Sequence, residues 1–155
     1  MQNLTKDLHK ALIKENKTLA IAESSTAGLI SKILTDNPGS SKYLLLGITA
    51  YSNQIKNKIL KIPASILSKN GAVSEETALL MAKNVRKLAK ADLGLAVTGI
   101  AGPTGARINK PVGTAFIAVT DGKRNLCQRF LFKGDRSSVR KQTALQSLQL
   151  LKSIL

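Results

Sequence analysis

Residues 19–34 read LAIAESSTAGLISKIL, and this stretch decides the fold. It begins with a short apolar run, typical of a buried strand, and ends with the apolar spacing of a helix. Between them, residues 23–28 are mostly small or polar, which predicts a tight turn that leads straight from the strand into the helix. A strand followed directly by a helix is typical of α/β proteins.

The rest of the chain repeats this alternation on both sides. Apolar runs predict strands at 43–51, which we expect to be a central strand, and at 93–97, 112–120 and 125–132. Helical patterns and start signals predict helices over the first 16 residues, after Ser52, and at 63–67, 74–91 and 137–154. Asp121-Gly122 predicts a hairpin between the last two strands. The chain is therefore expected to form one domain, residues 1–155, with the α/β fold of a three-layer α/β/α sandwich around a mixed β-sheet.

Composition indicates a globular protein. At 155 residues and 43% hydrophobic content, the chain is long enough to bury a core. No apolar stretch is long enough to span a membrane, and the first residues lack the apolar region of a signal peptide. The one cysteine, Cys127, rules out an internal disulfide and fits a reducing compartment. We expect a soluble, cytoplasmic protein that does not bind a membrane.

The formal charge of +15 would attract polyanions or anionic substrates. The lysines are spread along the chain, however, and the only dense run lies between Lys83 and Lys90 on one helix. Aromatic residues make up 3%, too few for a base-stacking surface. A nucleic-acid binder is therefore not favoured, although a DNA-binding assay at moderate ionic strength remains its test.

The residue inventory excludes most catalytic arrangements. His9 is the single histidine, and it is expected to be a solvated surface residue rather than part of a triad. Cys127, in the middle of a strand, is expected to be a buried structural thiol. One histidine and one cysteine cannot assemble the usual zinc site, and nine acidic residues leave few carboxylate pairs. Hydroxyl groups and lysines remain.

Three segments offer such groups where strands end, which is where ligands bind in open α/β sheets. The turn at 23–28 exposes Ser24 and backbone N–H donors that suit an oxyanion, or it is simply a helix cap. Lys56 lies one turn into a helix, where the dipole lowers the pKa of its ammonium. If it is also partly buried beside a serine, it could act as a base; the alternative is a solvated lysine like many others in the chain. Tyr51 could orient this pair or relay a proton. The glycine-rich loop at 98–105 permits close backbone approach to a ligand, but it matches neither the Walker pattern nor the dinucleotide-binding fingerprint.

Together these segments resemble the CinA C-terminal domain family, the nicotinamide-nucleotide amidohydrolases. The matching blocks occur in the family's order and cover nearly the whole chain. They are AESSTAG at 22–28, PGSS at 38–41, YSN at 51–53 with Lys56, GAVSE at 71–75, TGIAGP at 98–103, KPVGT at 110–114, and GDR at 134–136 with Arg140. The chain differs from the common pattern at Ser25, where the family has cysteine, and at Ala27, where it has glycine.

The resemblance implies a nicotinamide mononucleotide deamidase of pyridine nucleotide salvage, with Ser24 as nucleophile, Lys56 as base and Tyr51 nearby. Backbone N–H groups of residues 26–28 would hold the oxyanion, and no metal or cofactor is needed. The substrate-binding residues would be Ser25, Thr26, Gly28, Ser40, Ser41, Thr98, Gly99, Gly102 and Arg140. Among them, Arg140, Ser40, Ser41 and the loop at Thr98 would cradle the phosphate and ribose. The resemblance also implies a stand-alone form, and the apolar runs suggest a homo-oligomer. A non-catalytic nucleotide-binding or regulatory module of the same fold is the alternative.

Overall fold

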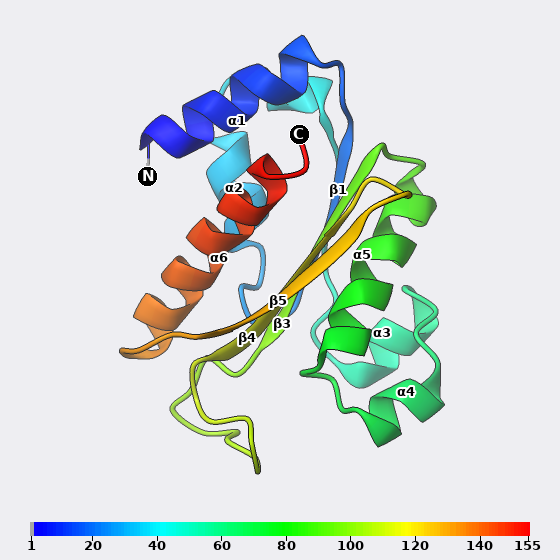
Figure 1. The fold of residues 1–155 in the computed structure, drawn as a ribbon, viewed down its shortest axis with the longest axis vertical. Coiled ribbons are helices and arrows are strands. Elements are labelled where there is room, and N and C mark those ends of the chain that lie inside the picture. The colour runs from blue at the N-terminus through cyan, green and yellow to red at the C-terminus, as the bar shows by residue number, and fades with distance from the viewer. Residues whose placement is uncertain (1) are drawn as a thin grey trace.

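The computed structural model describes residues 2–155. It has a five-stranded sheet with one layer of helices on each face (Figure 1). The strands are β1 (Leu19–Glu23), β2 (Leu44–Thr49), β3 (Leu93–Gly99), β4 (Thr114–Thr120) and β5 (Asn125–Leu131). The helices are α1 (Gln2–Lys14), α2 (Leu29–Thr35), α3 (Asn53–Lys58), α4 (Ala64–Lys69), α5 (Glu75–Ala89), α6 (Arg136–Lys152) and the short 3₁₀ helix η1 (Ser40–Lys42). Figure 1 shows α1, α2 and α6 on one face and α3, α4 and α5 on the other, which confirms the three-layer α/β/α sandwich.

The sheet has the strand order β2-β1-β3-β4-β5 and is mixed, as predicted. β1 pairs in parallel with β2 and β3, whereas β4 is antiparallel to both β3 and β5. Glu23, the last residue of β1, pairs with Thr49 and with Val97, so the carboxyl ends of the three parallel strands lie side by side at one end of the sheet. β4 begins at the same end, because Ala115 pairs with Gly99. The three candidate segments, at 23–28, 51–56 and 98–105, therefore meet at this end of the sheet.

The prediction that residues 43–51 form a central strand is wrong, because β2 lies at the edge of the sheet. Its residues alternate between half-buried and exposed, and the side chain of Leu45 is 49% exposed. Its apolar side chains nevertheless pack on both layers: Leu44 contacts the core beneath α1 and α6, and Ile48 the core beneath α5. Apolar composition alone therefore does not report a strand's place in the strand order of the sheet.

Alternating side chains of β1 pack into two separate hydrophobic cores, one on each face of the sheet. Leu19 and Ile21 pack under α1, α2 and α6, and Ala20 and Ala22 pack against α5. The small residues allow α5 to lie close to the sheet. A Cβ on Gly94 of β3 would lie 2.2 Å from the carbonyl oxygen of Ala82 on α5. This close packing fixes α5 relative to the sheet.

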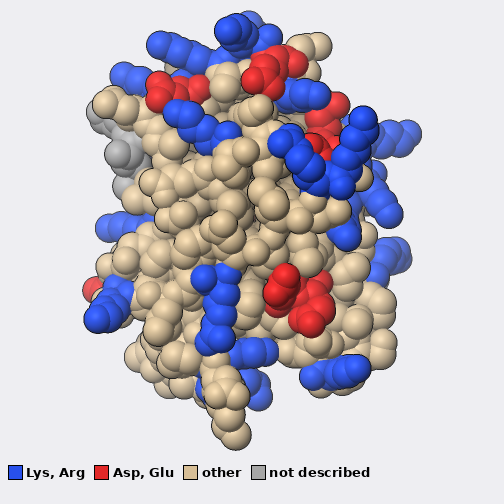
Figure 2. Space-filling model, in the orientation of Figure 1, with Lys and Arg blue, Asp and Glu red and all other residues tan. Residues whose placement is uncertain are grey.

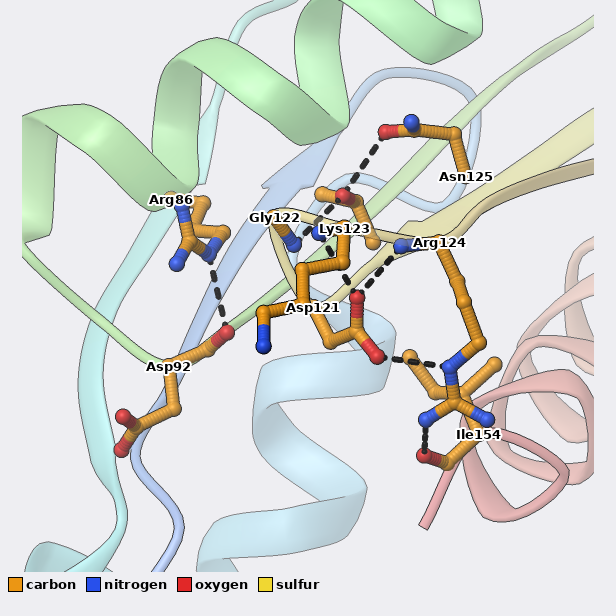
Figure 3. A network of polar contacts seen from close by, with 9 residues as sticks. Arg86, Asp92, Asp121, Gly122, Lys123, Arg124, Asn125 and Ile154 are labelled. Carbon is orange, nitrogen blue, oxygen red and sulfur yellow. Dashed lines mark hydrogen bonds and ion pairs between the residues drawn. The ribbon is translucent and has the colours of Figure 1, made fainter.

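A polar network at the other end of the sheet, where β1 and β3 begin, connects the β4–β5 turn to the end of α6 (Figure 3). The guanidinium of Arg124 donates to Asp121 Oδ2 at 2.7 Å and to the carbonyl oxygen of Ile154. Just before β3, the carbonyl oxygen of Asp92 accepts from Arg86 Nε of α5 at 2.8 Å. These contacts are structural, since they lie where β3 begins and the site lies where it ends. None of the described helices is long and apolar enough to cross a membrane.

Candidate active site

The turn after β1 is organised by the carboxylate of Glu23, which is fully buried. Its Oε2 accepts hydrogen bonds from the backbone N–H groups of Gly28 and Ile30, each at 3.0 Å. Its Oε1 accepts from the N–H and the hydroxyl of Ser31, at 2.9 and 2.8 Å. The side chain therefore caps α2 and fixes the turn that carries Ser24. Sequence reasoning assigned Glu23 no role, since its partners lie up to eight residues further along the chain.

Glu23 also corrects the expected oxyanion site. The N–H of Gly28 is bound to the carboxylate, and the N–H of Ala27 donates to the carbonyl oxygen of Ser24 at 3.2 Å. Within residues 2–155, the N–H groups of Ser25 and Thr26 donate no hydrogen bond. Thr26 is fully buried, so the donor open to a ligand is the N–H of Ser25, one residue before the group of donors that the sequence suggested. Ala27 adopts φ 51°, a left-handed conformation in which glycine is less strained.

Lys56 and Ser24 form a buried pair. Lys56 Nζ lies 3.0 Å from Ser24 Oγ, although the two residues are far apart in the sequence. The ammonium group also lies 2.8 Å from the carbonyl oxygen of Ala50 and 3.0 Å from that of Tyr51. Lys56 is 1% exposed and Ser24 is 8% exposed. A neutral amine in this position can donate to the two carbonyls and direct its lone pair at the serine hydroxyl.

Burial lowers the pKa of Lys56 from 10.5 to about 8. The cause is the loss of hydration, rather than the helix dipole expected from the sequence. Among the described residues, no carboxylate forms an ion pair with Lys56, so nothing offsets this loss with an opposite charge. A substantial neutral fraction of Lys56 is therefore present slightly above neutral pH, as a general base requires.

Tyr51 contributes through two different groups. Its carbonyl oxygen accepts from Lys56 Nζ, so the backbone at this residue helps to orient the amine. Its phenol ring is 55% exposed, and the hydroxyl accepts from Arg136 at 3.1 Å. Arg136 also donates to the carbonyl oxygen of Gly102 at 2.8 Å. Arg136 therefore lies in the site although sequence reasoning gave it no role; its signal was the GDR block at 134–136.

The glycine-rich loop forms the opposite wall. Thr98 is 1% exposed, and its hydroxyl donates to the carbonyl oxygen of Ala72 at 2.7 Å. A Cβ on Gly99 would lie 2.8 Å from the carbonyl oxygen of Thr114 and 3.1 Å from Ser25 Oγ. Glycine at position 99 is thus required for the close approach of the turn at Ser25 to β4.

These walls enclose a cavity of about 260 Å³, which we call the dyad cavity. Seven of the residues expected in the site line it: Ser24, Ser25, Tyr51, Lys56, Thr98, Gly99 and Gly102. The remaining lining residues are Ala72, Val73, Ile100, Ala101, Thr104, Gly105 and Arg136. Five expected substrate-binding residues are absent from its lining: Thr26, Gly28, Ser40, Ser41 and Arg140.

Those five residues lie behind the turn or at the far edge of the sheet. Arg140 donates to the carbonyl oxygen of Thr26 at 2.7 Å, so it supports the turn from the side of α6. Ser40 and Ser41 lie in η1, just before β2, where the carbonyl oxygen of Tyr43 accepts from the N–H of Leu19. This is the edge where β1 begins, whereas Ser24 follows its end. The expectation that the two serines cradle a phosphate beside Ser24 is wrong for this chain's own cavity.

The single histidine and cysteine lie outside the dyad cavity. His9 is half-buried rather than fully solvated, because its ring packs edge-on against Tyr43 with 5.5 Å between centroids. Cys127 lies in β5 and is half-buried, and burial raises the pKa of its thiol to about 12. A thiol of this kind is protonated and unreactive at neutral pH. Among residues 2–155, no cluster of three or more His, Cys, Asp or Glu side chains is placed to hold a metal ion.

Fold and site together define an α/β/α protein with a buried serine–lysine pair where its parallel strands end. The chain belongs to the CinA family: residues 1–155 match the model of the CinA C-terminal domain. It is 53% identical over 147 residues to a CinA-like protein of Syntrophus aciditrophicus, and 46% identical over 146 residues to one of Desulfotalea psychrophila. Each match covers 94% of this chain and 35% of the relative, so the chain spans about a third of these curated relatives.

Solved structures show the same fold. A competence-damaged protein (CinA) superfamily protein of Escherichia coli superposes with a TM-score of 0.95 at 32% identity, covering 99% of this chain and 89% of that one. Competence damage-inducible protein A of Klebsiella pneumoniae gives a TM-score of 0.94 at 30% identity, covering 97% and 94%. The sandwich is thus the fold of these family members.

Proposed function

We propose that this chain is an amidohydrolase in which Ser24 attacks a carboxamide and Lys56 acts as the general base. One observation carries the proposal: a lysine that is 1% exposed has its amine 3.0 Å from a serine hydroxyl, and both residues line a cavity. A structural lysine would place its ammonium in water or beside a carboxylate. This one has only two carbonyl oxygens and the serine as partners.

The reaction would proceed in two steps. Neutral Lys56 takes the proton of Ser24 as Oγ bonds to the amide carbon, and the unpaired N–H group of Ser25 stabilises the oxyanion. The C–N bond then breaks, and ammonia leaves with the proton that Lys56 returns. In the second step Lys56 takes a proton from water, whose oxygen attacks the acyl-enzyme. The carboxylic acid leaves, and Ser24 recovers its proton.

The proposed substrate is nicotinamide mononucleotide, converted to nicotinate mononucleotide and ammonia within pyridine nucleotide salvage. Its support is the resemblance to the nicotinamide-nucleotide amidohydrolases, together with membership of the CinA family. The charge of +15 favours an anionic substrate, and the dyad cavity of about 260 Å³ has room for a pyridine carboxamide. The chemistry uses only side chains and backbone groups, so the proposal includes no cofactor.

Ammonia release from nicotinamide mononucleotide tests the proposal. We expect Ser24→Ala and Lys56→Met each to reduce kcat by about 10³-fold or more, since the two groups act as a unit. Ser65→Ala and Lys58→Met are the matched controls, because both remove an exposed side chain that does not line the dyad cavity. Full activity in folded Ser24→Ala or Lys56→Met would refute the pair. Binding of the mononucleotide without turnover by the wild type would instead indicate a nucleotide-binding module.

A further inference from the structure

A second hollow adjoins the dyad cavity and is larger, at about 840 Å³. We call it the annex. Both hollows share four lining residues, Ala72, Val73, Ile100 and Gly105, so a ligand can extend from one to the other. The annex lies between the end of α4 and the loop that joins β3 to β4, which projects from the lower end of the sheet in Figure 1.

The annex is cationic. Its charged lining residues are Lys69, Arg107 and Lys110, and no carboxylate lines either hollow. Within the described chain none of the three forms an ion pair. Figure 2 shows Lys and Arg side chains gathered around the projecting loop. A hollow with several unpaired cations and no opposing anion attracts a negatively charged ligand.

The loop holds two of these cations in a defined arrangement. The backbone N–H of Arg107 donates to the carbonyl oxygen of Lys110 at 2.9 Å, and the N–H of Lys110 donates back at 2.9 Å. Directly paired residues of an antiparallel ladder project their side chains to the same side. The tip is held by Arg129 of β5, which donates to the carbonyl oxygen of Asn109. The guanidinium and the ammonium therefore face the annex together.

Lys110 also reaches across to α4. Its half-buried ammonium donates to the carbonyl oxygen of Asn70 at 2.9 Å, which leaves further N–H groups free for a ligand. Arg136, the cation of the dyad cavity, is already bound to Gly102 and Tyr51. The cations of the annex thus have fewer hydrogen-bond partners within the protein than Arg136 has, and they lie away from Ser24 along the shared wall.

We propose that the annex binds a phosphate group carried at the far end of the amide substrate, through Arg107 and Lys110. The inference rests on the proposed amidase, because a carboxamide at Ser24 directs the rest of a ribose-linked substrate along the shared wall. Arginine and lysine donate charge-assisted hydrogen bonds to phosphate oxygens. This subsite replaces the cradle that the sequence placed at Ser40, Ser41 and Arg140.

Steady-state kinetics with nicotinamide mononucleotide and with nicotinamide riboside, which lacks the phosphate, tests the subsite. Arg107→Gln and Lys110→Gln should each raise KM for the mononucleotide about tenfold with little change in kcat, and leave the riboside unaffected. Lys10→Gln is the control, since it removes the same charge from exposed α1. Equal effects on both substrates, or effects no larger than in the control, would overturn the proposal.

A binding measurement separates failure of the subsite from failure of the amidase. Calorimetry with ribose 5-phosphate needs no turnover, and wild type should bind it about tenfold more tightly than Arg107→Gln or Lys110→Gln. If neither pyridine compound is hydrolysed but this difference is found, the amidase fails and the subsite stands. If the mononucleotide is hydrolysed but ribose 5-phosphate binds all variants equally, the amidase stands and the subsite fails.

Discussion

Replacing Lys56 by methionine should change how the stability of the protein depends on pH. The side chain is 1% exposed, and burial lowers its pKa from 10.5 to about 8. Methionine is of similar length and has no charge, so the variant lacks this titration. The quantity of interest is the difference in free energy of unfolding between wild type and Lys56→Met, since all other titrating groups are common to both proteins.

The sign follows from proton binding. Below pH 8 both the folded and the unfolded chain hold the lysine proton, and wild type bears the full cost of burying the ammonium. Between pH 8 and 10.5 the unfolded chain holds a proton that the folded chain has lost, so wild type gains stability as the pH rises. A pKa lowered from 10.5 to about 8 corresponds to a gain of roughly 3 kcal/mol across this interval.

Urea unfolding at intervals from pH 7 to pH 11 measures this difference. The free-energy difference should rise by roughly 3 kcal/mol with pH and then level off. Lys58→Met removes an exposed ammonium from the same helix and is the control. Its free energy of unfolding relative to wild type should not show this rise with pH. A flat difference for Lys56→Met would mean that Lys56 titrates alike in both states, and the reasoning for a neutral base would fail.

Three further predictions concern groups around the site and at the far edge of the sheet. Glu23→Gln should lower stability by about 2 kcal/mol, because an amide nitrogen must face N–H donors that the carboxylate accepted; an unchanged melting temperature would contradict this. Gly99→Ala should cost about 1–3 kcal/mol and slow ammonia release, because its Cβ would lie 2.8 Å from the carbonyl oxygen of Thr114; wild-type kcat would argue against the close approach. Hydrogen bonds from the backbone N–H and guanidinium of Arg124 and from the N–H of Lys123 hold the pKa of Asp121 well below 3.8 (Figure 3). Wild type should therefore lose stability relative to Asp121→Asn as the pH falls below 3.8. Parallel acid unfolding curves for the two proteins would refute this contribution.

Much of the site follows from the sequence for local reasons. The turn at 23–28 joins a strand to a helix, and the ends of parallel strands meet at one edge, so Ser24, Tyr51 and Thr98 were expected near one another. The inventory of one histidine and one cysteine removed competing nucleophile–base pairs. The resemblance then selected Lys56. Self-association also remains a prediction of the sequence.

Other features depend on contacts between distant segments. Arg136 meets Gly102 from 34 residues away, and Lys110 meets Asn70 from 40 residues away. No periodicity or motif spacing encodes such pairs, because they arise only when loops from different strands pack against each other. For the same reason Ser40 and Ser41, which lie in a motif, were assigned to the wrong edge of the sheet: their place depends on the direction in which β2 runs.

The sequence by itself determined the α/β alternation, the mixed sheet with its hairpin, and the hydroxyl and amine groups available for chemistry. The tertiary structure alone decided that β2 lies at the edge, that Glu23 holds the turn, and that Lys56 is buried without an ion pair. The physical reason is that helix and strand patterns reflect neighbours a few residues apart, whereas hydration and the pKa of Lys56 depend on every segment packed around it.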